Sequence, residues 1–223
     1  MPPVQKSVIE HDFTQEDTWR VFRIMSEFVE GFDALSNIGP AVSIFGSSRA
    51  KKNTYYCRQA ELTAKAMVRA GYAVITGAGP GIMEAANKGA KEAKGQSIGL
   101  NILIPSAQKA NRYITKLLEF DYFFCRKVMF LKYSKAFVFF PGGYGTFDEL
   151  GEVVTLIQTK RIRPFPCILY GSPYWKGFLH WLKTTSVPAD TITADDLKLF
   201  QHADRPEQVV AIIEKFYRQP ARV

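Results

Sequence analysis

The feature that most limits how this chain can fold is an apolar run that passes directly into a glycine-rich turn and then into a helical segment. Residues 136–140 are continuously apolar, which is typical of a strand buried on both faces. Residues 141–149 read PGGYGTFDE, and residues 150–158 have the apolar spacing of a helix. A strand that turns tightly into a helix is the repeating unit of a sheet covered by helices.

The same alternation runs through the rest of the chain. We predict the other strands at residues 41–45, 72–76, 97–103 and 165–170, a short last strand at 197–200, and a strand or strand end at 120–124. We predict helices at residues 55–69, 126–133, 150–159, 175–185 and 207–217, and a glycine loop followed by a helix at residues 77–94. This order predicts an α/β fold: a single-domain, Rossmann-like, doubly wound and mainly parallel sheet with helices on both faces.

An N-terminal region precedes this domain. Residues 1–13 are predicted to be a loose tail, and Thr14 is a capping residue at the start of a helix. Apolar side chains then recur at helical spacing from Trp19 to Leu35, and we expect this stripe to pack on the domain rather than on a partner chain. We therefore divide the chain into a tail and amphipathic helix (1–40) and a Rossmann-like α/β domain (41–223).

Composition narrows the class of protein. The 223 residues are 47% hydrophobic and 22% charged, which suits a folded core, and the net charge is +8. That charge either aids solubility or attracts an anionic ligand, and the absence of a nucleic-acid-binding signature argues against a nucleic-acid partner. Three cysteines without metal or redox spacing, and no apolar run of signal-peptide or membrane-spanning type, lead us to expect a cytoplasmic protein with reduced thiols.

Three loops rich in glycine or serine, at residues 46–49, 77–81 and 142–146, each follow a predicted strand. Because the carboxyl ends of parallel strands meet at one edge, we expect these loops to form a nucleotide-sized pocket. Glycines expose backbone N–H groups and helix starts favour phosphate, although each loop alone could be a plain tight turn. The second loop is not a dinucleotide fingerprint, because Ile82 stands where the third glycine belongs.

Two acidic residues follow these loops. Glu149 either completes a capping box with Thr146 or faces a bound ligand. Glu84 either pairs with a helix dipole or faces the same ligand. Two carboxylates in this setting suit attack at a sugar carbon, where positive charge develops in the transition state.

Arg126 and Lys127 stand at the start of a predicted helix, where basic residues are unfavourable. They could hold a phosphate or a base, or form a solvated pair. We expect the aromatic residues near them to be core rather than a base-stacking shelf; they are Tyr122, Phe123, Phe124 and Phe130. No histidine has an assigned role, and no metal-ligand or cofactor-lysine pattern appears, so we expect neither a metal nor a cofactor.

Together these motifs resemble a known family. Residues 141–149 are similar to the PGGxGTxxE signature of the "lonely guy" (LOG) family, the cytokinin riboside 5′-monophosphate phosphoribohydrolases, many of whose relatives carry a lysine decarboxylase label. Residues 126–127 match its Arg-Lys pair, and residues 79–87 match its GPGxMEAxN loop. The resemblance runs from about residue 42 to 181 and is to the longer bacterial branch. Cys125 differs from the residue found before the pair in plant-type members.

The resemblance implies hydrolysis of the N-glycosidic bond of a purine nucleoside 5′-monophosphate, either AMP or an N6-modified AMP, to a free base and ribose 5-phosphate. It implies that Arg126 and Glu149 are the catalytic pair. It also implies a set of substrate-binding residues: Ser47, Gly79, Gly81, Glu84, Lys127, Gly142, Gly143, Gly145 and Thr146. The family usually forms homodimers or larger homo-oligomers.

The sequence leaves a second function open. A relative with this fold can hold a nucleotide or a phosphorylated cofactor without turnover. The motifs do not fix the base of the substrate, and they assign no role to the polar loop at residues 105–113.

Overall fold

The computed structural model describes residues 19–103 and 109–218, and it contains one seven-stranded sheet in which every neighbouring pair is parallel. The strand order is β4-β3-β2-β1-β5-β6-β7. The strands are β1 (Ala41–Phe45), β2 (Ala73–Thr76), β3 (Ser97–Ile102), β4 (Lys116–Phe120), β5 (Ser134–Phe139), β6 (Cys167–Tyr170) and β7 (Phe200–Ala203). The predicted parallel sheet is confirmed.

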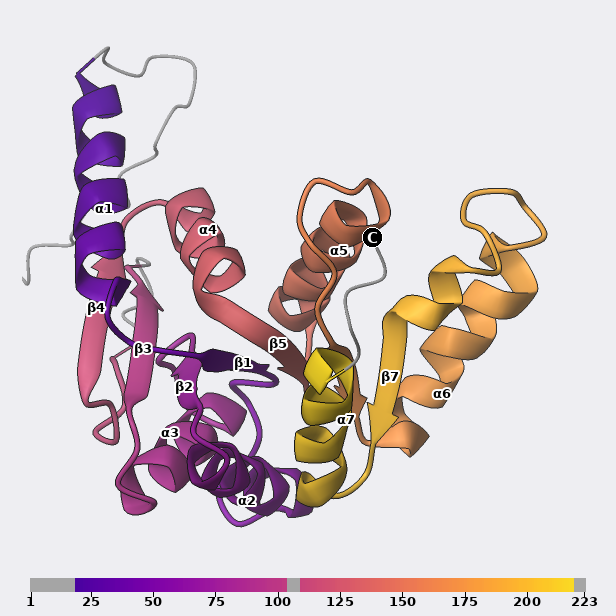
Figure 1. Ribbon diagram of the computed structural model, residues 1–223, viewed down its shortest axis with the longest axis horizontal. Coiled ribbons are helices and arrows are strands. Elements are labelled where there is room, and N and C mark those ends of the chain that lie inside the picture. The colour runs from indigo at the N-terminus through magenta and orange to yellow at the C-terminus, as the bar shows by residue number, and fades with distance from the viewer. Residues whose placement is uncertain (1–18, 104–108, 219–223) are drawn as a thin grey trace, which may run out of the picture.

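Helices cover both faces of this sheet (Figure 1). One layer contains α2 (Tyr55–Arg69), α3 (Ile82–Glu92) and α7 (Pro206–Arg218). The other contains α1 (Arg20–Leu35), α4 (Phe123–Tyr133), α5 (Tyr144–Gln158) and α6 (Ser172–Trp181), and α6 runs on into a π-helical turn at Leu182–Ser186. The doubly wound prediction is therefore confirmed.

Two hydrophobic cores explain why the strands are apolar throughout. Successive strand residues point to opposite faces. On β1, Val42 and Ile44 pack in the core beneath α2 and α3, while Ala41 and Phe45 pack in the core shared with α4 and α5. Since each face of the sheet is covered, both sets of side chains are buried, and their burial is the main favourable contribution to folding.

Two strands differ from the prediction. The edge strand β4 was not predicted as such, because it has only one buried residue, Phe120, and no alternating or continuous apolar run. The segment predicted as the last strand is a 3₁₀ turn at Asp196–Leu199, and β7 follows it. Edge strands bury little side-chain surface, so their sequence signal is weak.

Two helix starts also differ. The helix predicted to begin at Arg126 begins at Phe123, so Arg126 and Lys127 are not its first residues. Helix α5 begins at Tyr144, inside the glycine-rich segment, rather than at residue 150. Helix α3 begins at Ile82, directly after the predicted glycine loop, because Gly81 has φ +68° and ψ −124°, which is not helical.

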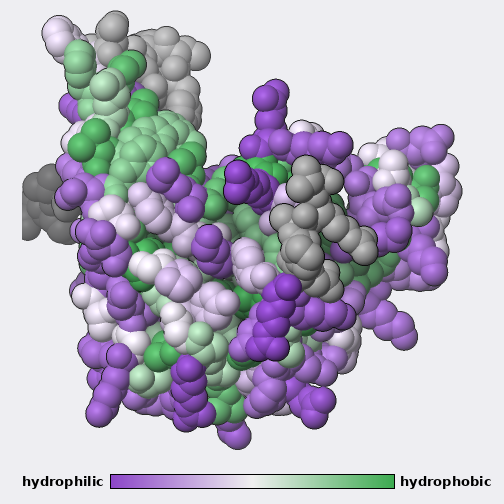
Figure 2. Space-filling view, viewed as in Figure 1, coloured by the Kyte–Doolittle hydropathy of each residue, from purple (hydrophilic) through white to green (hydrophobic). Residues whose placement is uncertain are grey.

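Helix α1 packs on the domain through one of its faces. Ile24 and Phe28 contact the core shared with α4, while Phe22, Met25 and Val29 are exposed. Figure 2 shows apolar side chains on this projecting helix at the upper left. The predicted start at Thr14 lies outside the described residues. No helix in the described part of the chain is long and apolar enough to cross a membrane.

Candidate active site

The strand order reverses between β1 and β5, and the pocket lies at the carboxyl ends of these two strands. Open α/β sheets bind ligands at such a reversal point, because the loops on either side diverge and leave a crevice. The chain passes from β1 toward β2 on one side and from β5 toward β6 on the other. The topology therefore brings the glycine-rich loops to one place, as expected.

Backbone hydrogen bonds join the three loops directly. The N–H of Ser47 donates to the carbonyl of Pro141 over 3.0 Å, and the N–H of Ile82 donates to the carbonyl of Ser47 over 3.1 Å. Gly81 packs so closely on the first loop that a Cβ there would lie 2.3 Å from the Ser47 carbonyl oxygen. The first loop is thus held between the other two, and glycine is required where they touch.

The resulting pocket has a volume of about 610 Å³, within the range of small-molecule sites. Its polar side chains come from Ser47, Ser48, Arg49, Arg126, Thr146 and Glu149. Its apolar and aromatic wall comes from Phe45, Met83, Ile102, Phe123, Phe130, Tyr144 and Phe147. A ligand with an anionic end and a flat apolar part would complement both.

The start of α5 forms part of the pocket wall. Gly143 is the N-cap residue, and the first-turn residues Tyr144 and Gly145 line the pocket. First-turn N–H groups have no partner inside a helix, and the helix dipole adds positive potential there. Gly142 lies just behind this turn, where a Cβ would lie 2.0 Å from the Thr146 hydroxyl oxygen. This geometry suits a phosphate group.

Glu149 is a buried carboxylate with one cationic neighbour. It is 5% exposed, and its Oε1 lies 3.6 Å from Nη2 of Arg126. Burial raises the pKa of Glu149 to about 7, while the positive charges of Arg126 and Lys127 oppose that rise. Because the helix begins at Tyr144, Glu149 is in its second turn and cannot form a capping box with Thr146. The capping interpretation of this carboxylate is therefore wrong.

Arg126 reaches the pocket from the first turns of α4. Burial lowers the pKa of this guanidinium, and the charges of Glu149 and Asp148 act in the opposite direction. Its Nε has no hydrogen-bond partner in the described structure. Its guanidinium carbon lies 5.3 Å from the ring centre of Phe123, a cation–π distance. The group thus carries an unused donor beside a buried carboxylate.

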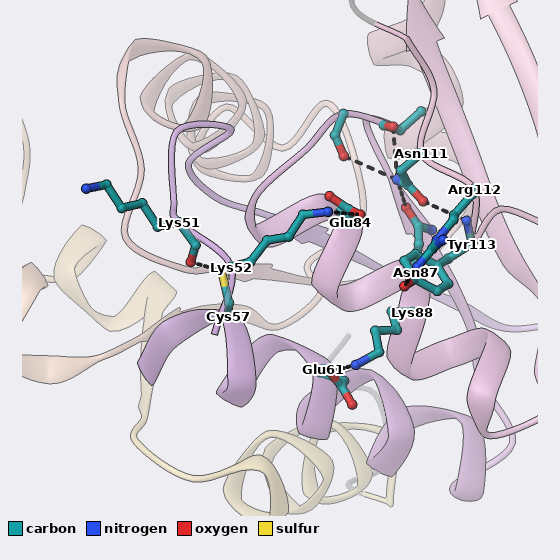
Figure 3. A network of polar contacts seen from close by, with 12 residues as sticks. Lys51, Lys52, Cys57, Glu61, Glu84, Asn87, Lys88, Asn111, Arg112 and Tyr113 are labelled. Atoms are coloured by element: carbon teal, nitrogen blue, oxygen red, sulfur yellow. Dashed lines mark hydrogen bonds and ion pairs between the residues drawn. The ribbon is translucent and has the colours of Figure 1, made fainter. Parts of the chain in front are cut away.

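Several predicted site residues lie elsewhere. Lys127 turns toward α5, where its Nζ lies 2.8 Å from Asp148 and 3.4 Å from Glu152. Glu84 pairs with Lys52 over 3.1 Å, as Figure 3 shows, and its neighbour Met83 lines the pocket instead. The pocket lining thus unites Arg126 and Glu149 with four predicted binding residues: Ser47, Gly143, Gly145 and Thr146. The predicted residues outside the lining are Gly79, Gly81, Glu84, Lys127 and Gly142.

No role for Asn111 could be predicted from the sequence. The structure places this residue behind the second glycine loop (Figure 3). Its Nδ2 donates to the carbonyls of Ala78 (2.9 Å) and Gly79 (3.2 Å) and to Oδ1 of Asn87 (2.9 Å). Its backbone N–H also donates to Ala78, a residue with an unfavourable φ of +66°. Asn111 therefore fixes this loop. Spacing could not reveal it, because its partners are 24 to 33 residues away.

The aromatic residues near Arg126 divide into two pairs. Tyr122 and Phe130 are buried, as predicted. Phe123 and Phe124 are about half exposed, so the prediction that they belong to the core is wrong. Phe123 and Phe130 both line the pocket.

The fold and the site together define a class: a Rossmann-like α/β protein whose pocket, at the reversal point of its sheet, is lined by the start of a helix and by a buried carboxylate–guanidinium pair. A family model described as "Possible lysine decarboxylase" matches residues 83–213, which is more than half of the chain. The chain therefore belongs to this family, and the LOG family resemblance predicted from its motifs is confirmed.

One curated relative is the Arabidopsis thaliana protein "Probable cytokinin riboside 5'-monophosphate phosphoribohydrolase LOG6". It is 29% identical to this chain over 114 residues, which cover 51% of this chain and 57% of that protein. The match thus spans little more than half the length of the relative.

Solved structures show the same fold. The molybdenum cofactor binding protein of Rippkaea orientalis superposes with a TM-score of 0.58 at 19% identity, covering 80% of this chain and 96% of that one. The molybdenum cofactor carrier protein of Chlamydomonas reinhardtii gives a TM-score of 0.58 at 21% identity, covering 81% and 99%. DNA processing protein A of Streptococcus pneumoniae gives 0.53 at 14% identity, covering 80% and 62%.

Proposed function

We propose that the protein is a hydrolase that cleaves the N-glycosidic bond of a purine nucleoside 5′-monophosphate, AMP or an N6-modified AMP. Water adds its hydroxyl to the anomeric carbon, and the base leaves with the bonding electrons and takes up a proton. The products are a free base and ribose 5-phosphate. The name of the Arabidopsis relative supports this reaction class.

The observation that carries the proposal is the buried pair of Glu149 and Arg126 beside the phosphate site at the start of α5. Cleavage of a glycosidic bond passes through a transition state with positive charge on the sugar. An ionised Glu149, held in a buried site, would stabilise that charge or orient the attacking water. The raised pKa of Glu149, about 7, leaves it poised between ionised and neutral forms near neutral pH.

The other residues are given roles by their position. We assign the phosphate to Ser47, Gly143, Gly145 and Thr146, with Gly142 allowing the close turn behind them. We assign the base to the aromatic wall that includes Phe123. Arg126 would hold the phosphate or assist departure of the base through its unused donor. None of the described pocket-lining residues is a lysine, so the site offers no Schiff-base nucleophile for a decarboxylase.

Two of the predicted substrate-binding residues, Glu84 and Lys127, could contact a ligand only after breaking their present ion pairs. Glu84 can reach a ribose only if its ion pair with the exposed Lys52 opens. Lys127 can reach a ligand only by leaving Asp148 and Glu152. We therefore propose that Lys127 holds α4 to α5 and contributes to the site indirectly.

The test is release of free base from AMP and, separately, from N6-isopentenyl-AMP, followed by chromatography. We expect wild-type protein to release base and Glu149→Ala to lose at least about 100-fold in rate, as removal of a transition-state electrostatic group does. Glu214→Ala is the control, because Glu214 lies on α7 and pairs with Arg218 outside the pocket. Equal rates for wild type and Glu149→Ala would refute the catalytic role.

The second candidate is a carrier that holds a nucleotide or a phosphorylated cofactor without turnover. It is favoured by the two structural neighbours whose names describe binding or carrying a molybdenum cofactor. A carrier would bind nucleotide in calorimetry without releasing base and would keep its affinity in Glu149→Ala. Binding without turnover by the wild-type protein would therefore move the assignment to a carrier.

A further inference from the structure

Helix α1 lies outside the stretch matched by the family model, yet it contacts the helix that carries Arg126. Arg20 donates from Nε to the hydroxyl of Tyr122 over 3.0 Å, and its guanidinium carbon lies 4.8 Å from the centre of that ring. At the other end of α4, the hydroxyl of Tyr133 donates to the carbonyl of Phe32 over 3.1 Å. Helix α1 is thus attached to α4 at both ends.

Between these contacts, Glu27 binds the start of α4. Its Oε1 accepts a hydrogen bond from the N–H of Asp121 over 2.6 Å, and its Oε2 accepts one from the N–H of Tyr122 over 3.4 Å. Tyr122 is the N-cap residue of α4 and makes no side-chain capping bond of its own. A carboxylate at this position satisfies exposed backbone donors and complements the positive end of the helix dipole.

The capped turn leads directly to Arg126. The N–H of Arg126 donates to the carbonyl of Tyr122 over 3.3 Å. The backbone of Arg126 is therefore hydrogen-bonded to the residue whose N–H Glu27 binds. The preceding residue, Cys125, is fully buried with its Sγ 4.0 Å from the carbonyl of Ile24 on α1. A movement of the α4 start would therefore move the guanidinium relative to Glu149.

We propose that Glu27 is a positioning residue: by capping α4 from a separate helix, it holds the guanidinium of Arg126 beside the Glu149 carboxylate. Its effect on catalysis rests on the proposed hydrolase function. Its effect on the geometry of the pair does not, so the two can be tested separately.

Displacement of Arg126 would change the charges that face Glu149. Arg126 and Lys127 on α4 act to lower the pKa of this carboxyl, while Glu152 and Asp148 on α5 act to raise it, in addition to burial. If Arg126 moves away, the opposing positive charge weakens and the pKa of Glu149 rises further. Because catalysis uses the ionised carboxylate, the acid limb of the rate profile would move to higher pH. A general loss of stability would leave that limb in place.

The experiment compares Glu27→Ala, Glu27→Gln and the control Glu30→Ala. Glu30 has the same charge and lies one turn along α1, but its carboxylate accepts from Ser26 of its own helix over 3.0 Å. We expect Glu27→Ala to lower kcat/KM by about 10- to 100-fold and to shift the acid limb to higher pH. Glu27→Gln keeps an acceptor oxygen and should recover most of the rate, while Glu30→Ala should stay within about 2-fold.

A readout without turnover separates the two proposals. The carboxyl carbon of Glu149 can be followed by NMR as a function of pH in ¹³C-labelled protein, with melting temperatures measured to show that each variant is folded. A rise in the Glu149 pKa in Glu27→Ala supports the positioning role even if no nucleotide is hydrolysed. An unchanged Glu149 pKa in folded Glu27→Ala, or an equal rise in Glu30→Ala, would overturn it.

Discussion

At the scale of single residues, the buried carboxylate of Glu149 is chemically useful but lowers the stability of the folded protein. A carboxylate that is almost fully buried is destabilised in its charged form, and the one close cation, Arg126, only partly offsets this. The same conflict between stability and function is common at active sites.

Replacement of Glu149 by glutamine should make the pH dependence of stability visible. The wild-type carboxyl ionises near 4.5 when unfolded and near 7 when folded. Between these values the folded chain keeps a proton that the unfolded chain releases, so wild-type stability falls as pH rises. We expect the melting temperature of Glu149→Gln, relative to wild type, to increase from pH 4.5 to 7 and then level off. A difference that stays constant across this range would contradict the raised pKa.

Asn111 should matter for stability out of proportion to its size. Asn111→Ala removes its side-chain hydrogen bonds to Ala78, Gly79 and Asn87 and leaves those acceptors in a partly buried site. We expect a loss of about 2–3 kcal/mol in urea unfolding, together with weaker AMP binding. Arg112→Ala is the matched control, since the exposed Arg112 side chain contacts its neighbour Tyr113. Similar losses in both variants would argue against a specific role for Asn111.

At the scale of elements, the pocket depends on contacts between loops that follow different strands. The loop after β1 is bonded to the loop after β5 through Ser47 and Pro141, and to the start of α3 through Ser47 and Ile82. Each loop is short, and each restrains its neighbours. A change where two loops touch should therefore affect the whole pocket.

Two glycine-to-alanine variants distinguish a steric clash between loops from the general preference of a helix for alanine over glycine. Gly81→Ala places a Cβ against the Ser47 carbonyl at a positive φ, so we expect it to lower the free energy of unfolding by at least about 2 kcal/mol. Gly151→Ala lies within α5 with nothing near its Cβ, so we expect it to stabilise the protein by about 1 kcal/mol. Chemical denaturation of both variants tests this, and a neutral Gly81→Ala would show that the loops can separate without cost.

At the scale of the whole molecule, one face of α1 is both apolar and exposed. Phe22, Met25, Val29 and Phe32 follow the 3–4 spacing of a helix–helix seam and are exposed. The family resemblance implies a homo-oligomer, so we predict that a second copy of this chain covers this face in a dimer.

Val29→Glu should weaken that dimer, because it places a charge in the apolar seam. We expect light scattering after size exclusion to report a dimer for wild type and a lower mass for Val29→Glu at the same concentration. Leu62→Glu is the control, since Leu62 is exposed on α2 in the opposite helical layer. A wild-type monomer, or a dimer unaffected by Val29→Glu, would exclude this seam.

Local sequence patterns were sufficient for most of the fold. The continuous apolar runs predicted buried parallel strands, and helix α2 was predicted with its observed bounds, Tyr55–Arg69. The glycine loops were predicted to meet at one edge, because parallel strands share their carboxyl ends. The patterns failed at β4 and β7, which lie at the edges of the sheet and bury few side chains.

The sequence by itself determined the layers of this protein, the edge of the sheet that carries the pocket, and the motif residues Arg126 and Glu149. Only the tertiary structure decided which side chains face one another. Glu27 and Asp121 are 94 residues apart, and Asn111 and Ala78 are 33 residues apart. Neither contact can be predicted from the periodicity or the motif spacing of the sequence. The physical reason is that repeating patterns record burial, which each segment encodes locally. A hydrogen bond between distant segments exists only after packing has brought them together.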